Sequence, residues 1–249
     1  MQKKVDYLVD WLRDQVAKTN TRGLVVGLSG GIDSAVVAYL IKQALPNHSL
    51  AVIMPCQSSK EDLKDAQAVV EGANIKAMTI DLTLTHQQLL DTIKHELIQK
   101  EVYQPNHDQL ASANLKARLR MSTLYTIATN HQYLVVGTDN AAEWYTGYFT
   151  KYGDGGVDIN PLVHLTKGEV REMAQYLNVA EEIILKQPSA GLWDGQTDEN
   201  EMGTTYDYID GYLKGEEIPE QDRKVIEAMH QRSKHKRSIV ITPAPFDEA

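Results

Sequence analysis

Residues 24–34 read Leu-Val-Val-Gly-Leu-Ser-Gly-Gly-Ile-Asp-Ser, and this stretch decides the fold. The residues from Leu24 to Leu28 form a short apolar run between glycines, which is typical of a parallel strand buried on both faces. A Ser-Gly-Gly turn follows, and the residues from about Ser34 to Ala44 have a helical pattern that Pro46 ends. A buried strand, a glycine-rich turn and a helix are the first half of a βαβ unit.

The same alternation continues along the chain. Apolar runs at 50–54, 76–82 and 133–137 predict three more strands. Helical patterns are found at 5–16, 58–72 (opened by a capping box of Ser58 with Glu61), 89–101, 114–129, 166–177 (opened by a capping box of Thr166 with Glu169), 206–212 and 223–233. We therefore expect an α/β fold, a Rossmann-like parallel sheet flanked by helices, in one domain over residues 1–249. Residues 187–205 are polar and show little periodicity, which predicts either a functional loop or a disordered one.

Composition excludes some classes of function. The chain has 249 residues and a formal net charge of −9, which disfavours a nucleic-acid partner. It contains no apolar run of transmembrane length and no signal-like segment, so we expect no membrane association and a cytoplasmic location. Cys56 is the sole cysteine, so no disulfide can form within the chain.

The glycine-rich turn has the chemistry of an anion site. Gly30 and Gly31 lack Cβ atoms, so the backbone can approach an anion closely, and the start of a helix favours negative charge. Ser29 and Ser34 add hydroxyl donors. Asp33 would repel a bare phosphate, so its place here points to a ligand for Mg²⁺.

Residues 27–34, called the phosphate loop below, match neither a Walker A loop nor the dinucleotide fingerprint, because the lysine and the glycine spacing are missing. The alternative is a strand-to-helix turn that binds nothing. The full Ser-Gly-Gly-Ile-Asp-Ser string resembles the signature of the N-type ATP pyrophosphatases. This resemblance implies cleavage of ATP to AMP and pyrophosphate, with transfer of an adenylate to a substrate oxygen.

Longer strings in the second half narrow the resemblance to the ammonia-dependent NAD synthetase family. They are 114–121 (Asn-Leu-Lys-Ala-Arg-Leu-Arg-Met), 137–143 (Gly-Thr-Asp-Asn-Ala-Ala-Glu), 146–158, 186–190, 198–199, 203–207 and 235–237. The resemblance runs from about residue 5 to 240. It implies that the carboxylate of deamido-NAD attacks the α-phosphorus of ATP, and that ammonia then displaces AMP to give NAD.

The resemblance also assigns the ATP and metal contacts. The residues implied for ATP are Gly27, Leu28, Ser29, Gly30, Gly31, Ile32, Asp33, Ser34, Met54, Thr138, Lys186 and Thr205. Asp33 and Glu143 are implied as the two carboxylates that hold Mg²⁺. Lys186 is implied to steady the charge on the phosphates as the α-phosphorus is attacked. Taken alone, Glu143 reads as a solvated helix carboxylate, Lys186 as a surface lysine and Met54 as plain core.

Contacts to the second substrate are assigned in the same way. Those implied for deamido-NAD are Arg118, Lys151, Asp158, His235 and Lys236. Arginine and lysine suit a dinucleotide diphosphate. Asp154 is the candidate for accepting a proton from ammonium, which must become ammonia before it can attack. The alternative for Asp154 is that it only shapes the Gly153–Gly156 turn.

The sequence departs from the family pattern in two places. Residues 190–199 differ from the common Ala-Asp-Leu form, with Gly191 in place of an acid, and Ser112-Ala113 replaces a Lys-Gly pair. We find no cysteine-based glutaminase segment, so we expect free ammonia as the nitrogen donor. The resemblance further implies a homodimer, and loops at 56–62 and 187–215 that close over the substrates.

Two other interpretations remain. A tRNA-directed amidating or thiolating enzyme would share the phosphate loop, but the acidic charge argues against it. A nucleotide sensor without catalysis would not need Asp33, Glu143 and Lys186 together.

Overall fold

The computed structural model describes residues 1–189, 197–238 and 242–243. In this part of the chain four strands form one parallel sheet with the order β3-β2-β1-β4. The strands are β1 (Gly23–Leu28), β2 (Ser49–Ile53), β3 (Lys76–Thr79) and β4 (Tyr133–Val135). The predicted α/β fold with a parallel sheet is confirmed.

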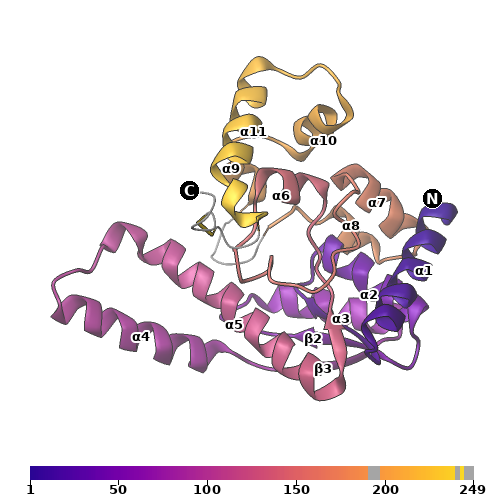
Figure 1. Ribbon diagram of the computed structural model, residues 1–249, viewed down its shortest axis with the longest axis horizontal. Coiled ribbons are helices and arrows are strands. Elements are labelled where there is room, and N and C mark those ends of the chain that lie inside the picture. Colours follow the sequence, from indigo (N-terminus) through magenta and orange to yellow (C-terminus); the bar gives the residue numbers. More distant parts are fainter. Residues whose placement is uncertain (190–196, 239–241, 244–249) are drawn as a thin grey trace.

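Helices cover both faces of the sheet (Figure 1). The faces follow from the alternation of side chains along β1: Val26 packs with α1 (Gln2–Thr19), α2 (Ile32–Ala44), α3 (Lys60–Ala73) and α7 (Lys167–Tyr176), while Val25 packs with α5 (Asp108–His131). β1 is buried on both sides, as its continuous apolar run requires.

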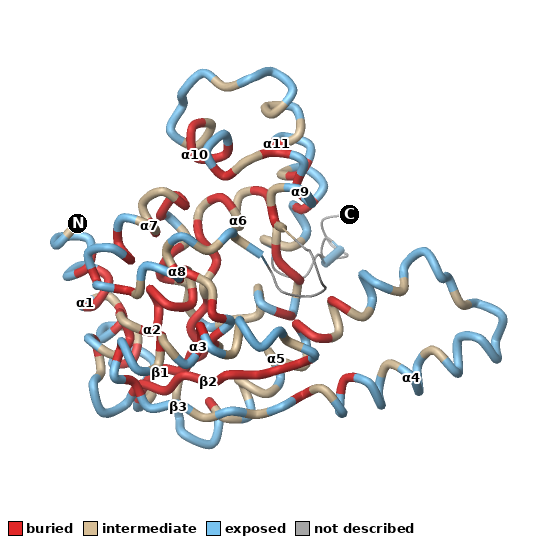
Figure 2. The backbone as a smooth tube through the Cα atoms, turned by 180° about the vertical axis from the view of Figure 1, so that it is seen from behind, coloured by how far each residue is buried: buried red, intermediate tan, exposed pale blue. Residues whose placement is uncertain are grey.

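α4 (Thr83–Gln99) and the first half of α5 project from the body as a long helical hairpin, closed by a 3₁₀ turn at Pro105–His107 (Figures 1 and 2). Both helices begin about six residues earlier than predicted. Asp81 accepts a hydrogen bond from Thr83 N, at the first residue of α4, at 2.8 Å, and Leu82 is the N-cap. Lys94 and Asp108 form an ion pair of 2.6 Å that ties α4 to the start of α5.

A further group of helices follows β4 in the chain: α6 (Ala141–Thr146), α8 (Glu181–Leu185), α9 (Asp198–Met202), α10 (Tyr206–Lys214), α11 (Glu220–Arg232) and a 3₁₀ turn at Lys234–Lys236. α6, α10 and α11 share an apolar cluster of their own that includes Tyr206, Ile209 and Ile226. They stand to one side of the sheet (Figure 1).

Three local predictions need correction. The capping residue of α3 is Ser59, whose Oγ accepts from Asp62 N at 3.0 Å, whereas Ser58 Oγ accepts from Cys56 N instead. β3 ends at Thr79, three residues early. The stretch predicted to lack structure contains α9, while its residues 190–196 lie outside the described part.

The predicted capping box of Thr166 with Glu169 is confirmed. Among the residues described, no helix combines the length and apolar character that a bilayer crossing requires.

Candidate active site

A cavity of about 640 Å³ opens at the carboxyl ends of β1, β2 and β4, the edge at which parallel α/β sheets bind ligands. Its walls include the phosphate loop apart from Gly30, the start of α3, part of α5 and the loop after β4. Of the predicted site residues, it is lined by Gly27, Leu28, Ser29, Gly31, Ile32, Asp33, Ser34, Met54, Thr138, Glu143, Asp154, Lys186, His235 and Lys236. Predicted site residues from distant parts of the sequence thus line one cavity.

The phosphate loop is held in a conformation that requires glycine. Gly30 has a φ of 83°, and a Cβ at this position would lie 2.6 Å from Asp62 O. Ser34 Oγ donates to Gly31 O at 2.9 Å and lies 3.2 Å from Ser29 Oγ. Gly31 is the N-cap of α2, so no capping side chain competes with an anion for the N–H groups of the first helical turn.

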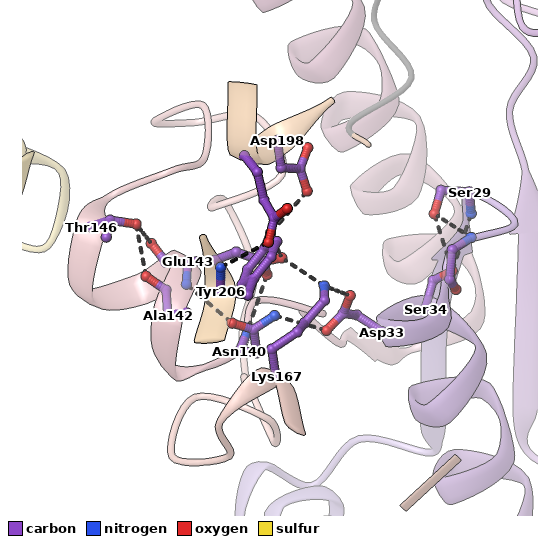
Figure 3. A network of polar contacts seen from close by, with 12 residues as sticks. Ser29, Asp33, Ser34, Asn140, Ala142, Glu143, Thr146, Lys167, Asp198 and Tyr206 are labelled. Carbon is purple, nitrogen blue, oxygen red and sulfur yellow. Dashed lines mark hydrogen bonds and ion pairs between the residues drawn. The ribbon is translucent and has the colours of Figure 1, made fainter. Parts of the chain in front are cut away.

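Asp33 and Glu143 converge on one buried cation, the ammonium group of Lys167 (Figure 3). Lys167 Nζ lies 2.6 Å from Asp33 Oδ2 and 3.3 Å from Glu143 Oε1, and the lysine side chain is 2% exposed. Asp33 comes from the first turn of α2 and Glu143 from the first turn of α6. The two carboxylates predicted to share a metal therefore share a positive charge in the structure.

A hydrogen-bond network orients this pair (Figure 3). Asn140 Nδ2 donates to Asp33 Oδ1 at 2.9 Å, and Asn140 Oδ1 accepts from Glu143 N in a reciprocal capping box. The hydroxyl of Tyr206 lies 3.0 Å from Glu143 Oε1 and 2.8 Å from Asp198 Oδ2. These hydrogen bonds thus hold both carboxylates in a fixed orientation.

Burial dominates the electrostatics of the site. It raises the pKa of Glu143 to about 7, against the opposing effect of Lys167. Burial lowers the pKa of Lys167, but Asp33 and Glu143 outweigh it, so this pKa lies above its ordinary value. The ammonium of Lys167 therefore stays charged at neutral pH.

Two more carboxyl groups, Asp139 and Asp154, line the cavity beyond this pair. Burial and then the charge of Asp154 raise the pKa of Asp139 well above its usual range. Burial also raises the pKa of Asp154, whose Oδ1 accepts from Thr150 N at 2.9 Å. That bond bridges the loop that leads to Gly153, so the two sequence-based interpretations of Asp154, proton acceptor and turn residue, are compatible.

Comparison with known proteins gives this geometry a family. The profile of the NAD synthase family matches residues 4–240. The chain belongs to the NAD synthase family. It is 53% identical over 243 residues to an NH₃-dependent NAD⁺ synthetase of Alkaliphilus oremlandii, covering 98% of this chain and 97% of the relative.

Solved structures agree with this assignment. An NMN synthetase of Francisella tularensis is similar with a TM-score of 0.89 at 42% identity, covering 98% of both chains. An NH₃-dependent NAD synthetase of Campylobacter jejuni is similar with a TM-score of 0.76 at 31% identity, covering 97% of this chain and 98% of that one.

The basic residues predicted for deamido-NAD form a connected group in this NAD synthase family member. Arg118 Nη2 donates to Lys151 O at 3.4 Å, and Lys151 Nζ donates to His235 O at 2.5 Å. Lys236 Nζ, at the cavity wall, donates to Gly147 O at 2.8 Å and to Phe149 O at 2.6 Å. Arg118 and Lys151 are outside the cavity lining but adjoin it through these contacts.

Asp158 lies apart from that group. Its Oδ2 accepts from Val135 N at 2.8 Å and its Oδ1 from the hydroxyl of Tyr125 at 3.0 Å. Its carboxylate therefore accepts a hydrogen bond from the last residue of β4, and Asp158 is outside the cavity lining. A deamido-NAD contact for Asp158 stays a prediction without geometric support in this structure.

The remaining ATP predictions divide in the same way. Thr138 and Met54 line the cavity, and Met54 also belongs to the apolar cluster beneath α5, so both interpretations of it hold. Thr205 is outside the lining, and its Oγ accepts from Tyr208 N as the N-cap of α10. Lys186 lines the cavity, but its Nζ is bound by Asp62 at 2.8 Å and by Asp65 at 2.5 Å.

Sequence reasoning missed several side chains of this site: Asn140, Asp139, Lys167, Asp198 as a hydrogen-bond partner, and the Tyr206 hydroxyl. Asn140 and Glu143 have the Asn-x-x-Glu spacing of a capping box, so this signal was available. The sequence carries no signal for Lys167, because this residue lies 134 residues from Asp33 in the chain and resembles any other residue in the first turn of a helix.

Proposed function

We propose that this protein joins ammonia to the nicotinate carboxylate of deamido-NAD with cleavage of ATP to AMP and pyrophosphate. One observation carries the proposal: the phosphate loop, the Asp33–Glu143 pair and Asp154 open into a single cavity in a chain of the NAD synthase family. A sensor that only binds nucleotide would need the loop but not the buried carboxylates around it.

The first step is attack on ATP. A carboxylate oxygen of deamido-NAD bonds to the α-phosphorus, and the bond to the β-phosphoryl oxygen breaks, releasing pyrophosphate. The N–H groups at the start of α2 and the hydroxyls of Ser29 and Ser34 hold the phosphates. Lys186 is our candidate for stabilising charge there, after release from Asp62 and Asp65.

Asp33 and Glu143 fit a magnesium ion, because the Lys167 ammonium already stands between them as a cation and oxygen ligands suit Mg²⁺. When bound, this ion would offset the charge of the triphosphate. Asn140 and Tyr206 keep the two carboxylates aimed at one point.

The second step is amidation. Asp154 takes a proton from ammonium, and the nitrogen attacks the carboxyl carbon of the adenylate. The bond from this carbon to the AMP oxygen breaks, AMP leaves with the electron pair, and the nitrogen gives a second proton to solvent as the amide forms. Asp154 lies in the cavity lining, and burial keeps its pKa raised, which suits a proton acceptor.

The test is a product assay. The protein with ATP, Mg²⁺, ammonium and deamido-NAD is expected to yield NAD, AMP and pyrophosphate in equal amounts. Omission of deamido-NAD should abolish all three. Replacement of ammonium by glutamine should leave only background. Release of AMP and pyrophosphate without NAD would contradict the proposal.

A second candidate differs only in the size of the substrate. The strong similarity to the NMN synthetase of Francisella tularensis favours testing nicotinate mononucleotide, which would give NMN by the same two steps. The more identical Alkaliphilus relative is an NAD⁺ synthetase, so deamido-NAD remains our first choice. The ratio of kcat/KM for the two substrates decides between them.

For the quaternary state we propose a homodimer through the α4–α5 hairpin. Leu89, Ile93 and Leu97 recur every four residues on one face of α4 and are 37–42% exposed. Val102 and Leu110, elsewhere on the hairpin, are also apolar and are 55% and 58% exposed. A second copy related by a two-fold axis would cover the apolar face of α4.

The Ile93→Glu variant should convert the dimer to a monomer in light scattering after gel filtration. His95→Glu, about 200° around the helix, is the control and should not. A monomeric wild type would contradict this interface.

A cytoplasmic location also stays a proposal. The free thiol of Cys56, which is buried, is consistent with it.

A further inference from the structure

Hydrogen bonds hold the backbone of Lys167, and ion pairs hold its side chain. Lys167 is the first residue of α7, and its N donates to Asp210 Oδ1 at 3.0 Å, while Gly168 N donates to Asp210 Oδ2 at 2.8 Å. The backbone is thus anchored from α10, and the side chain reaches across to the phosphate-loop helix. Its Nζ also lies 4.5 Å from the centroid of the Tyr206 ring.

The position of this ammonium has an electrostatic consequence. Asp33 and Glu143 are largely buried, and two buried carboxylates without a cation repel each other at high cost. A bound Mg²⁺ needs carboxylate oxygens at about 2.0–2.1 Å in near-octahedral geometry. Lys167 Nζ lies 2.6 Å from Asp33 Oδ2 and 3.3 Å from Glu143 Oε1, so an ion that binds these same two oxygens would take its place.

We propose that Lys167 is a built-in counter-ion, which holds the Asp33–Glu143 pair together and is displaced when a divalent cation binds to these carboxylates. Lys167 is in this sense a positioning residue that competes with the metal. The inference rests on the proposed function, since it takes Asp33 and Glu143 as the metal ligands. It predicts weak metal binding by the nucleotide-free protein.

The experiment measures binding of Mn²⁺ alone, without nucleotide, by electron paramagnetic resonance of the free ion. Lys167→Met should bind Mn²⁺ about tenfold or more tightly than the wild type, because the competing cation is gone. The double variant Lys167→Met/Glu143→Gln should lose this gain. Lys236→Met is the control for charge, because it removes one positive charge from the same cavity while its hydrogen bonds go to carbonyl oxygens.

Thermal unfolding gives a second readout that does not depend on activity. In chelator, Lys167→Met should unfold at a lower temperature than the wild type, because it leaves two buried carboxylates without their cation. Added Mn²⁺ should raise its midpoint by more than it raises that of the wild type. If Lys167→Met does not fold, Lys167→Gln, which keeps a polar group, takes its place in both measurements.

The outcomes separate the inference from the function. Equal Mn²⁺ affinity of the wild type and Lys167→Met, with both weakened by Glu143→Gln, would overturn the counter-ion role and leave the metal site standing. If Glu143→Gln leaves the Mn²⁺ affinity unchanged, both in the wild type and in Lys167→Met, then the metal site and the inference are both wrong. NAD formation in the product assay would still support the proposed function.

Discussion

Asn140 Nδ2 donates to Asp33 Oδ1 over 2.9 Å and so joins the cap of α6 to the first turn of α2. The same side chain accepts from Glu143 N through Oδ1 at 3.1 Å. One fully buried amide therefore orients both carboxylates, with its donor on one and its acceptor beside the other.

Replacement of this amide should cost more than a helix cap alone. Asn140→Ala is expected to lower the free energy of unfolding by about 2–4 kcal/mol, because it removes the cap and leaves a carboxylate oxygen without its donor. Ser59→Ala removes the cap of α3 and one hydrogen bond to the partly exposed Asp62 carboxylate, and it should cost about 1 kcal/mol. Urea unfolding measures both. Asn140→Asp keeps an N-cap acceptor but sets a third carboxylate against Asp33, so wild-type stability in that variant would contradict this account.

Gly30 and Gly215 offer a matched pair for the phosphate loop. Both have positive φ, of 83° and 77°, so alanine is strained at either position. A Cβ at Gly30 would lie 2.6 Å from Asp62 O, whereas one at Gly215 meets nothing within 4 Å. Gly30→Ala should therefore be the less stable variant and should lose ATP binding, measured by calorimetry. Gly215→Ala should bind ATP as the wild type does, and an equal loss in the two variants would mean that backbone strain alone is responsible.

The elements that decide this fold carry their signals locally. The apolar run of β1, the glycines of the loop and the capping box at Thr166 each follow from a few neighbouring residues. Where the prediction failed, a competing local interaction decided. Ser58 and Ser59 both precede α3 with helix-start chemistry, and only the bond from Cys56 N to Ser58 Oγ shows which of them is the cap.

The site was predictable in part because the family strings name its residues. Asp33 and Glu143 were expected to meet, and they do. The sequence does not predict that Lys167 lies between them, since its contact with Asp33 depends on how α7 packs against α2. The role of Asp158 at the end of β4 depends likewise on tertiary placement that a single sequence does not encode locally.

Asp139 should make stability fall as the pH rises. It is 5% exposed, and its Oδ2 has no hydrogen-bond partner among the described residues. Because burial raises its pKa above the unfolded value, the folded state retains a proton that the unfolded state loses. Stability due to this group is complete below about pH 4, the unfolded pKa, and declines above it at up to about 1.4 kcal/mol per pH unit.

Asp139→Asn removes this titration. The difference in the free energy of unfolding between variant and wild type, measured in urea, should therefore shift in favour of the variant between pH 5 and pH 8. A constant difference over that range would show that Asp139 titrates normally in the folded protein.

Lys186 should matter to turnover as well as to stability. Its ion pairs with Asp62 and Asp65 lie at the cavity, and Asp65 is only 11% exposed, so their loss should cost about 1–3 kcal/mol, which leaves the protein folded. Lys186→Met should nevertheless lower kcat strongly if this lysine moves to the phosphates. Lys4→Met removes a more exposed ion pair, with Glu169, outside the cavity lining and is the control. Unchanged kcat in Lys186→Met would mean that this lysine only forms ion pairs with Asp62 and Asp65 and does not act on the phosphates.

Asp154 has two roles to separate, and one substitution separates them. In Asp154→Asn the side-chain oxygen can still accept from Thr150 N, so the turn at Gly153 is expected to survive and the unfolding temperature to change little. The proton acceptor for ammonium is lost, so the ammonium-dependent rate should fall by about 10²–10⁴. The residual rate should rise with pH, because free ammonia then no longer needs an acceptor.

Asp154→Ala completes the comparison, since it removes the acceptor and the bond to Thr150 N together. It should lose activity to the same extent as Asp154→Asn and lose stability as well. If Asp154→Asn retains full activity while Asp154→Ala does not, Asp154 serves the turn alone, and ammonium must lose its proton to another group in the cavity.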